Sequence, residues 1–243
     1  MTATPYPGRR QTAIGMAAVL MSRAAHAASP AQVAPALRLP PGGRPAVALT
    51  LDACPGAFDM RLARALVEQS VPASLFLTAL WIARNPDGLA FVLAHRDLFS
   101  LQNHGARHLP PVLGAGATFG LANAGTMDAI RAEVASGAAT VEAACGQAPT
   151  WFRGATALYS PDALAPIRAM GFGIAGFSLN ADMGASLPAA SVAARITKAQ
   201  DRDVIIGHIN QPLRPSGAGI AAGIAALKAQ GMAFVKLPDQ IAI

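Results

Sequence analysis

Short apolar runs alternate with longer helical patterns from Pro45 to the end of the chain, and this alternation constrains the fold more than any other feature. The expected strands are 46–51, 73–78, 99–102, 150–152, 172–179, 203–207 and 232–237. The expected helices are one after Asp59 and those at 87–95, 127–144, 161–170, 189–200 and 218–230. Strands that are mostly followed by helices predict an α/β fold with about seven parallel strands, either open or closed into a barrel.

The length and composition agree with one domain of this kind. The chain has 243 residues, of which 53% are hydrophobic and 13% charged, enough to form a sizeable core and too apolar for wholesale disorder. Residues 109–125 are Gly-rich and are expected to form a long loop. Residues 28–44 are rich in Pro and Ala and are expected to form an extended lead-in to a catalytic domain at 45–243.

Residues 1–27 have the pattern of an export signal. Arg9 and Arg10 precede an apolar run from Ala13 to Met21, and Ala25-His26-Ala27 provides a cleavage signal before Ala28. The arginine pair leaves two routes open, a twin-arginine signal or an ordinary secretory signal. The apolar run is about half the length that spans a bilayer, so no permanent membrane anchor is expected. The predicted location is periplasmic or secreted.

The charge gives little support to a nucleic-acid partner. The net charge is +6 at pH 7, but Arg9, Arg10 and Arg23 lie in the predicted signal, whose removal leaves +3. The three lysines do not cluster. A basic patch is the usual mark of nucleic-acid binding, so we expect no nucleic-acid partner.

Polar residues fall where predicted strands end. These residues are Asp52, Asn103, His104, Arg153, Asp182 and His208. In barrels and open parallel sheets, the carboxyl ends of the strands form the edge at which ligands bind and chemistry occurs. We therefore expect these side chains to form one site.

His104 and His108 stand four residues apart directly after a strand, and they are the best candidates for metal ligands. One turn of chain would point both rings the same way, toward a shared divalent ion, with zinc as the first candidate. The alternative is a polar loop with two solvated imidazoles.

The other polar residues suit acid–base chemistry. Asp52 ends an apolar strand, and is expected to be a general base or a metal ligand, with a turn or capping role as the alternative. His208 suits a general acid, or else a core histidine bonded to backbone. Arg153 and Asp182 are expected to pair with each other, either to orient these groups or as a purely structural ion pair.

The order of these motifs resembles that of the polysaccharide deacetylases, or carbohydrate esterase family four. Thr50 to Pro55 is similar to the family's first motif, T-F-D-D-G-P. His104 to His108 is similar to the second, H-[ST]-x-x-H, and Phe152-Arg153 to the third, R-x-P-Y. Asp182 falls where the fourth motif would lie, and Ile205 to His208 resembles the fifth, L-x-H. The resemblance covers about Ala46 to Leu237 and implies a distorted (β/α) barrel.

The resemblance also implies roles for these residues. Asp52 would be the catalytic base, oriented by Arg153. His208 would be the acid, tuned by Asp182, and His104 and His108 would bind the metal. The implied substrate is an acetylated glycan.

The chain departs from the family at one metal ligand, because Ala53 replaces the second aspartate of the first motif. Asp59 is the expected replacement, with Asp52, a water molecule or a degraded site as alternatives. Cys54 is a further candidate as a zinc thiolate, unless it forms a disulfide with Cys145, a question that the sequence leaves open.

Three functions follow from these patterns. The first is an exported, metal-dependent hydrolase that removes N- or O-linked acetyl groups from a polysaccharide of the cell envelope or extracellular space. The second is a non-catalytic carbohydrate-binding protein on the same fold, a hypothesis suggested by Ala53. The third is a metallohydrolase that cleaves C–N bonds in small molecules. Fold alone does not decide among them, because function depends on the site.

Overall fold

A computed structural model describes residues 1–2 and 31–238 of the chain. Apart from its first two residues, the expected export signal at 1–27 lies outside these residues, so signal and cleavage site stay predictions. In the described part of the chain, no helix is long and apolar enough to cross a bilayer.

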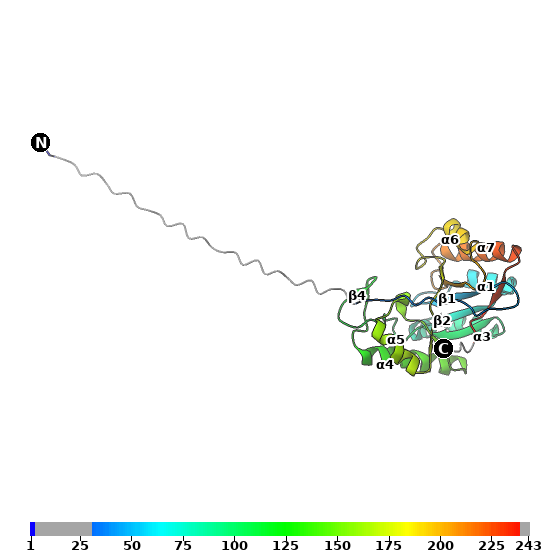
Figure 1. The fold of residues 1–243 in the computed structure, drawn as a ribbon, viewed down its shortest axis with the longest axis horizontal. Helices are drawn as coiled ribbons and strands as arrows, with labels where there is room; N and C mark the ends of the chain where they lie inside the picture. Colours follow the sequence, from blue (N-terminus) through cyan, green and yellow to red (C-terminus); the bar gives the residue numbers. More distant parts are fainter. Residues whose placement is uncertain (3–30, 239–243) are drawn as a thin grey trace.

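One large sheet organises the molecule (Figure 1). Its strands are β1 (Ala46–Ala53), β2 (Ala73–Leu77), β3 (Phe99–Asn103), β6 (Trp151–Phe152), β7 (Gly173–Ile174), β8 (Leu179–Asn180), β9 (Val204–His208) and β10 (Ala233–Val235). The order is β7-β6-β3-β2-β1-β9-β8, with β10 also paired to β1, and all pairs are parallel. The edge strands β7 and β8 do not pair with each other in the described structure, which leaves the barrel open. The predicted distorted (β/α) barrel is confirmed.

Helices connect most of the strands. They are α1 (Met60–Glu68), α2 (Ala79–Arg84), α3 (Pro86–Ala94), α4 (Met127–Cys145), α5 (Pro161–Ala169), α6 (Ala189–Ile196) and α7 (Ser216–Ala229), with a short 3-10 turn at Ala155–Ala157. The pair α6 and α7 packs together beside α1, whereas α4 and α5 lie together at the opposite end of the view in Figure 1. Helices thus cover the sheet as its alternating sequence predicts.

The structure differs from the expected elements in one strand, one helix that was not expected and one loop. The expected strand 172–179 is two strands, β7 and β8, at opposite ends of the sheet order, because the Ala175 and Gly176 carbonyls bond the Arg153 side chain. Helix α2 was not expected, because its six residues are too few to show a helical period; Thr78 caps it by accepting from the Trp81 backbone N–H. The expected loop at 109–125 contains a hairpin of β4 (Ala117–Thr118) and β5 (Leu121–Ala122).

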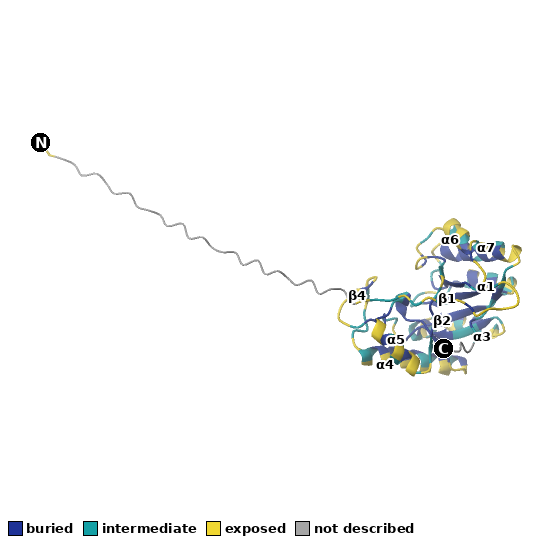
Figure 2. Ribbon diagram, viewed as in Figure 1, coloured by how far each residue is buried: buried dark blue, intermediate teal, exposed yellow. Residues whose placement is uncertain are grey.

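The two faces of β1 explain how the sheet positions a site. Side chains alternate across a strand, so Val47, Leu49 and Leu51 point one way and pack in the largest apolar core. Thr50 and Asp52 lie on the other face, buried and polar. Figure 2 shows β1 and β2 as the dark blue centre of the molecule, with exposed residues on the outer helix faces. The strand thus carries a carboxylate into the interior at its carboxyl end.

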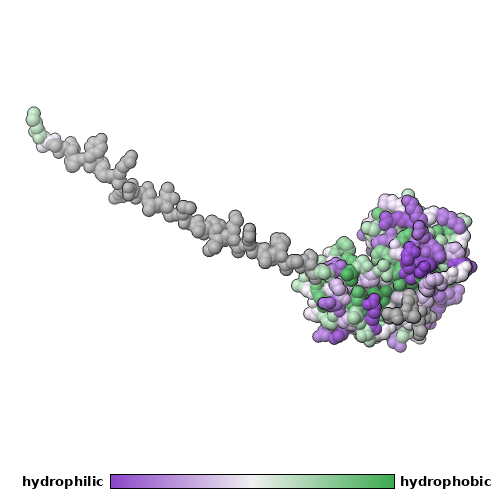
Figure 3. Space-filling view, in the orientation of Figure 1, coloured by the Kyte–Doolittle hydropathy of each residue, from purple (hydrophilic) through white to green (hydrophobic). Residues whose placement is uncertain are grey.

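The surface is not uniformly polar. In Figure 3 hydrophobic residues reach the surface between the part that carries β4 and the part that carries α6 and α7, while hydrophilic residues predominate over α6 and α7. Apolar atoms supply much of the surface of any folded protein, so exposed apolar residues of this kind are expected.

Candidate catalytic and metal-binding site

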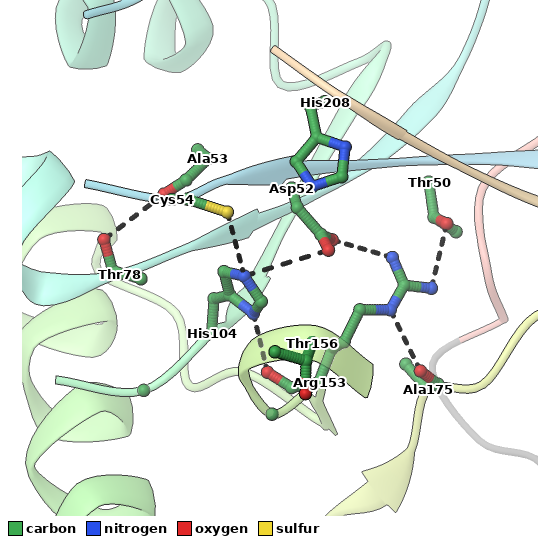
Figure 4. Close-up of polar contacts among 12 residues, drawn as sticks. Thr50, Asp52, Ala53, Cys54, Thr78, His104, Arg153, Thr156, Ala175 and His208 are labelled. Atoms are coloured by element: carbon green, nitrogen blue, oxygen red, sulfur yellow. Dashed lines mark hydrogen bonds and ion pairs between the residues drawn. The ribbon is translucent and has the colours of Figure 1, made fainter. Parts of the chain in front are cut away.

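Strand register brings the predicted site residues to one edge of the sheet. Asp52 near the end of β1 is paired with His208 at the end of β9. Asn103 at the end of β3 is paired with Phe152 at the end of β6. His104 and Arg153, which directly follow these two strands, are therefore also neighbours. Figure 4 shows the side chains of Asp52, His104, Arg153 and His208 gathered at this edge. These strand ends therefore meet at one edge of the sheet, but the Asn103 side chain donates to the Val134 carbonyl and accepts from the Gly105 backbone N–H instead of joining the cluster. The functional roles expected of the gathered side chains stay predictions.

Asp52 is held by a buried ion pair. Its Oδ1 accepts a hydrogen bond from Arg153 Nη1 at 2.8 Å, and both side chains are almost completely shielded from solvent. Burial acts to raise the pKa of Asp52, but the charge of Arg153, helped by His104 and His208, outweighs it and leaves the pKa below its usual value. Asp52 is therefore an ionised carboxylate at neutral pH, able to accept a proton.

Arg153 is itself fixed on every side. It donates to Thr50 Oγ1 at 2.9 Å and to the backbone oxygens of Ala175 and Gly176 at 3.0 and 3.1 Å. Its guanidinium carbon lies 4.3 Å from the centre of the Phe76 ring. These contacts leave the guanidinium one orientation. Arg153 does not pair with Asp182, so the expectation of that ion pair is wrong: Thr50 and Asp52 stand closer, on the inward face of β1.

Asp182 instead holds His208. The Nδ1 of His208 lies 2.9 Å from Asp182 Oδ1, and Asp182 Oδ2 accepts from the His208 backbone N–H at 2.8 Å. Burial acts to lower the pKa of His208, but hydrogen bonding to Asp182 and Cys54 and their negative charges raise it well above its usual value. This shift favours the protonated imidazole, whose Nδ1 is directed at a fully buried carboxylate.

His104 presents one nitrogen to the site. Its Nδ1 lies 2.7 Å from the Arg153 backbone carbonyl, which can only accept, so Nδ1 carries the hydrogen. In the neutral ring the lone pair is then on Nε2, which lies 3.5 Å from Cys54 Sγ and 3.8 Å from Asp52 Oδ2 (Figure 4). A histidine ligand is typically fixed in this way by a bond from its second nitrogen.

His108 is brought beside His104 by a loop that α4 holds. The two ring centres are 4.9 Å apart, and His108 Nε2 is buried without a hydrogen-bond partner among the described residues. Glu133 of α4 accepts from the backbone N–H groups of Arg107 at 2.8 Å and Leu109 at 3.1 Å. The turn needs glycine at Gly105, where φ is +87° and a Cβ would lie 2.5 Å from Glu133 Oε1. An unpaired buried nitrogen is what an incoming metal ion would satisfy.

Cys54 completes a cluster with these two histidines. The ligand atoms of Cys54, His104 and His108 all lie within 4.8 Å of one another. Burial acts to raise the pKa of the Cys54 thiol, but the charge of the neighbouring His104 and the contact with its Nε2 outweigh burial and hold the pKa well below its usual value. A cysteine and two histidines are donors that suit zinc. The residues present therefore fit a divalent metal ion.

Asp59 does not belong to this cluster, so the expectation that it binds the metal is wrong. Its Oδ1 caps α1 by accepting from the backbone N–H groups of Arg61 at 3.2 Å and Leu62 at 3.3 Å. Its other oxygen lies against Gly217 of α7, where an added Cβ would come within 2.4 Å of it. The Asp59 carboxylate therefore serves as the N-cap of α1 and not as a metal ligand.

The structure also answers the disulfide question. Both cysteines are free thiols, Cys54 half-buried at the cluster and Cys145 buried at the end of α4. No disulfide joins them.

Comparison with known proteins identifies the family. The family model described as polysaccharide deacetylase matches residues 40–175, more than half of the chain. The chain belongs to the polysaccharide deacetylase family. The match includes Asp52, His104, His108 and Arg153 and ends before Asp182. No curated protein sequence matches the chain.

Solved structures agree on the fold. The chain is similar to a CE4 family pseudoenzyme from Bacillus anthracis, at 19% identity and a TM-score of 0.64, over 80% of this chain and 64% of that one. It thus spans just under two thirds of that protein. It is similar to a family 4 acetyl xylan esterase from Clostridium thermocellum in complex with a cobalt ion, at 24% identity and a TM-score of 0.64, over 78% of this chain and 87% of that one. It is also similar to the family 4 carbohydrate esterase PdaA of Bacillus subtilis, at 18% identity and a TM-score of 0.65, over 84% of this chain and 82% of that one.

Glu133 is the positioning residue that the sequence analysis missed. It lies on α4 among the buried residues Ile130, Val134 and Gly137, where a carboxylate is costly unless it is hydrogen-bonded. A single charged residue on the apolar face of an Ala-rich helix could have indicated that Glu133 has a buried partner. The sequence does not show that this partner is the loop after β3.

Proposed function

We propose that this chain is an exported, metal-dependent hydrolase that removes N- or O-linked acetyl groups from a polysaccharide of the cell envelope or the extracellular space. One observation carries the proposal. Asp52, held by Arg153, and His208, held by Asp182, lie beside a cluster of potential metal ligands at one edge of the sheet. Family membership supplies the acetylated glycan as the substrate class.

His104 and His108 would hold the metal ion, which we propose to be zinc. Imidazole nitrogens are common zinc ligands, and His108 Nε2 is buried without a hydrogen-bond partner in the described structure, while His104 Nε2 faces Cys54 Sγ at 3.5 Å. When bound, such an ion polarises the acetyl carbonyl and stabilises the negative charge that develops on its oxygen.

The protein side chains move the protons. Asp52, ionised and fixed by Arg153, takes a proton from the attacking water as the water oxygen bonds to the acetyl carbon. His208, protonated and fixed by Asp182, gives a proton to the leaving nitrogen or oxygen as its bond to that carbon breaks. The products are acetate and the free amine or hydroxyl of the sugar. A base held ionised beside an acid held protonated is the arrangement that this reaction requires at neutral pH.

The test is acetate release by the purified chain from N-acetylglucosamine oligomers and from acetylated xylan. We expect release from one class, and a loss of about 100-fold or more in kcat for Asp52→Asn and for His208→Gln. Asp128→Asn, on an exposed helix position, is the matched control and should not change the rate. Full activity in Asp52→Asn would contradict the proposed role of the base.

A second candidate is a non-catalytic carbohydrate-binding protein on the same fold. It is favoured by Ala53, which lacks the carboxylate of the family motif, and by a similar structure described as a pseudoenzyme. Binding of a glycan with no acetate release from any acetylated substrate would select it.

The proposed location is the periplasm or the extracellular space. It is supported by the sequence pattern of residues 1–27. Cell fractionation with N-terminal sequencing of the exported protein tests it.

A further inference from the structure

We propose that Cys54 is the third protein ligand of the metal ion, in place of the carboxylate missing at Ala53, and that its thiolate makes the site select zinc over magnesium, calcium and manganese. The inference rests on the proposed metal dependence and adds the third ligand and the selectivity.

The distances in the cluster suit a tetrahedral zinc centre. With typical Zn–S and Zn–N bond lengths, the sulfur and nitrogen of two ligands in a tetrahedral site lie about 3.5 Å apart. Cys54 Sγ and His104 Nε2 are 3.5 Å apart. His108 brings the third donor atom within 4.8 Å of both, and its buried Nε2 has no other hydrogen-bond partner among the described residues. The three atoms could bind one ion with small side-chain movements.

The end of β1 explains why position 54, and not 53, supplies the donor. Ala53 is fully buried in the main apolar core, so its side chain faces away from the cluster. Its carbonyl accepts from the Thr78 hydroxyl at 3.2 Å, which ties the strand end to α2. Cys54, one residue later, leaves the strand half-buried and directs its sulfur at His104 (Figure 4).

The nearby carboxylates are engaged elsewhere. Asp59 caps α1 and Asp182 holds His208. Asp52 Oδ1 accepts from Arg153, and its Oδ2 lies 3.8 Å from His104 Nε2, outside the cluster. Among the described residues, no Asp or Glu joins the cluster of ligand atoms. The sulfur of Cys54 is thus the available third donor, and Asp52 is left free to accept a proton.

A thiolate ligand has a consequence for metal choice. Sulfur donors favour zinc and other thiophilic ions, whereas magnesium, calcium and manganese prefer oxygen. On binding, the Cys54 S–H bond breaks, its proton goes to solvent, and the sulfur bonds to the ion with no change in oxidation state. We therefore expect magnesium, calcium and manganese in large excess to leave bound zinc in place.

The experiment is a titration of the full chain with cobalt(II), followed in the near ultraviolet, where a cobalt–thiolate bond gives an intense charge-transfer band. We expect the band in the wild type, its loss in Cys54→Ser, and its retention in Cys145→Ser, the matched control at the other free thiol. Zinc affinity, measured by competition with a chromophoric chelator, should fall at least tenfold in Cys54→Ser only. Circular dichroism checks that each variant is folded.

A Cys54→Asp variant separates the effect of the sulfur donor from a simple loss of metal binding, because it keeps a third ligand but replaces sulfur with oxygen. It should bind cobalt without the band and discriminate less between zinc and manganese, because the new donor is oxygen. Cobalt bound by the wild type without the band, or a band that persists in Cys54→Ser, overturns the role of Cys54 and leaves the proposed metal dependence intact. No metal bound by the wild type overturns both.

Discussion

Replacing Arg153 by Met should reveal how much the buried ion pair with Asp52 contributes to the fold. The change removes the 2.8 Å bond to a carboxylate that is only 4% exposed, and the contacts to Thr50 and two backbone carbonyls. Removing one partner of a buried pair leaves an uncompensated charge and costs about 3–5 kcal/mol. Total stabilities of domains are about 5–15 kcal/mol, so the variant should lose a large part of its free energy of unfolding.

The loss should depend on pH in a defined direction. In the wild type the pKa of Asp52 is lowered, so the carboxylate adds stability above its unfolded-state pKa of about 4, and this is lost as pH falls through the folded-state value. In Arg153→Met burial acts without the guanidinium, so we expect the pKa of Asp52 to rise. Its carboxylate then destabilises the fold at neutral pH, and protonation relieves this as pH falls. The gap between the two proteins should therefore narrow toward acid pH.

Urea unfolding at pH 7 and pH 5 measures both effects. Arg131→Met is the matched control, because Arg131 pairs with Asp128 on the exposed face of α4, and it should not change the midpoint. Asp52→Asn combined with Arg153→Met should be more stable than Arg153→Met alone, since no buried charge remains. A loss below about 1 kcal/mol, or one that is equal at both pH values, would refute the reasoning.

Three further predictions concern the catalytic acid, the loop and the leader. Asp182→Asn removes the negative charge and leaves a weaker, neutral acceptor beside His208, so the pKa of His208 should fall and the alkaline limb of the pH–rate profile should move to lower pH, and an unmoved limb would exclude His208 as the acid. Glu133→Ala releases two backbone N–H groups of the metal loop and should weaken zinc binding about 10–100-fold in a chelator competition, while Glu142→Ala on the exposed face of α4 should not. The exported protein should begin at Ala28 by N-terminal sequencing, and an intact Met1 outside the cell would contradict the cleavage prediction.

The sequence predicted the fold and the edge that carries the site. Parallel strands place their carboxyl ends together, so the positions of Asp52, His104, Arg153 and His208 after apolar runs were enough to predict that they meet. The long buried strand β1 and the helix α4 were also predicted closely, because their hydrophobic periods are clear. Short elements such as β7 and β8 carry too few residues to show a period, and they were predicted as one strand.

Only the tertiary structure decided which side chains contact one another. The strand pattern alone paired Arg153 with Asp182, whereas the family resemblance implied that Arg153 orients Asp52, and the structure decides for Asp52 because the inward face of β1 brings it to the guanidinium. Asp59 is lost as a ligand because a helix begins there, and Cys54 points at His104. Strand order and hydrophobic period follow from local sequence, whereas these contacts depend on loops and on residues up to about a hundred positions apart in the chain. Their geometry is set by packing, which no local pattern encodes.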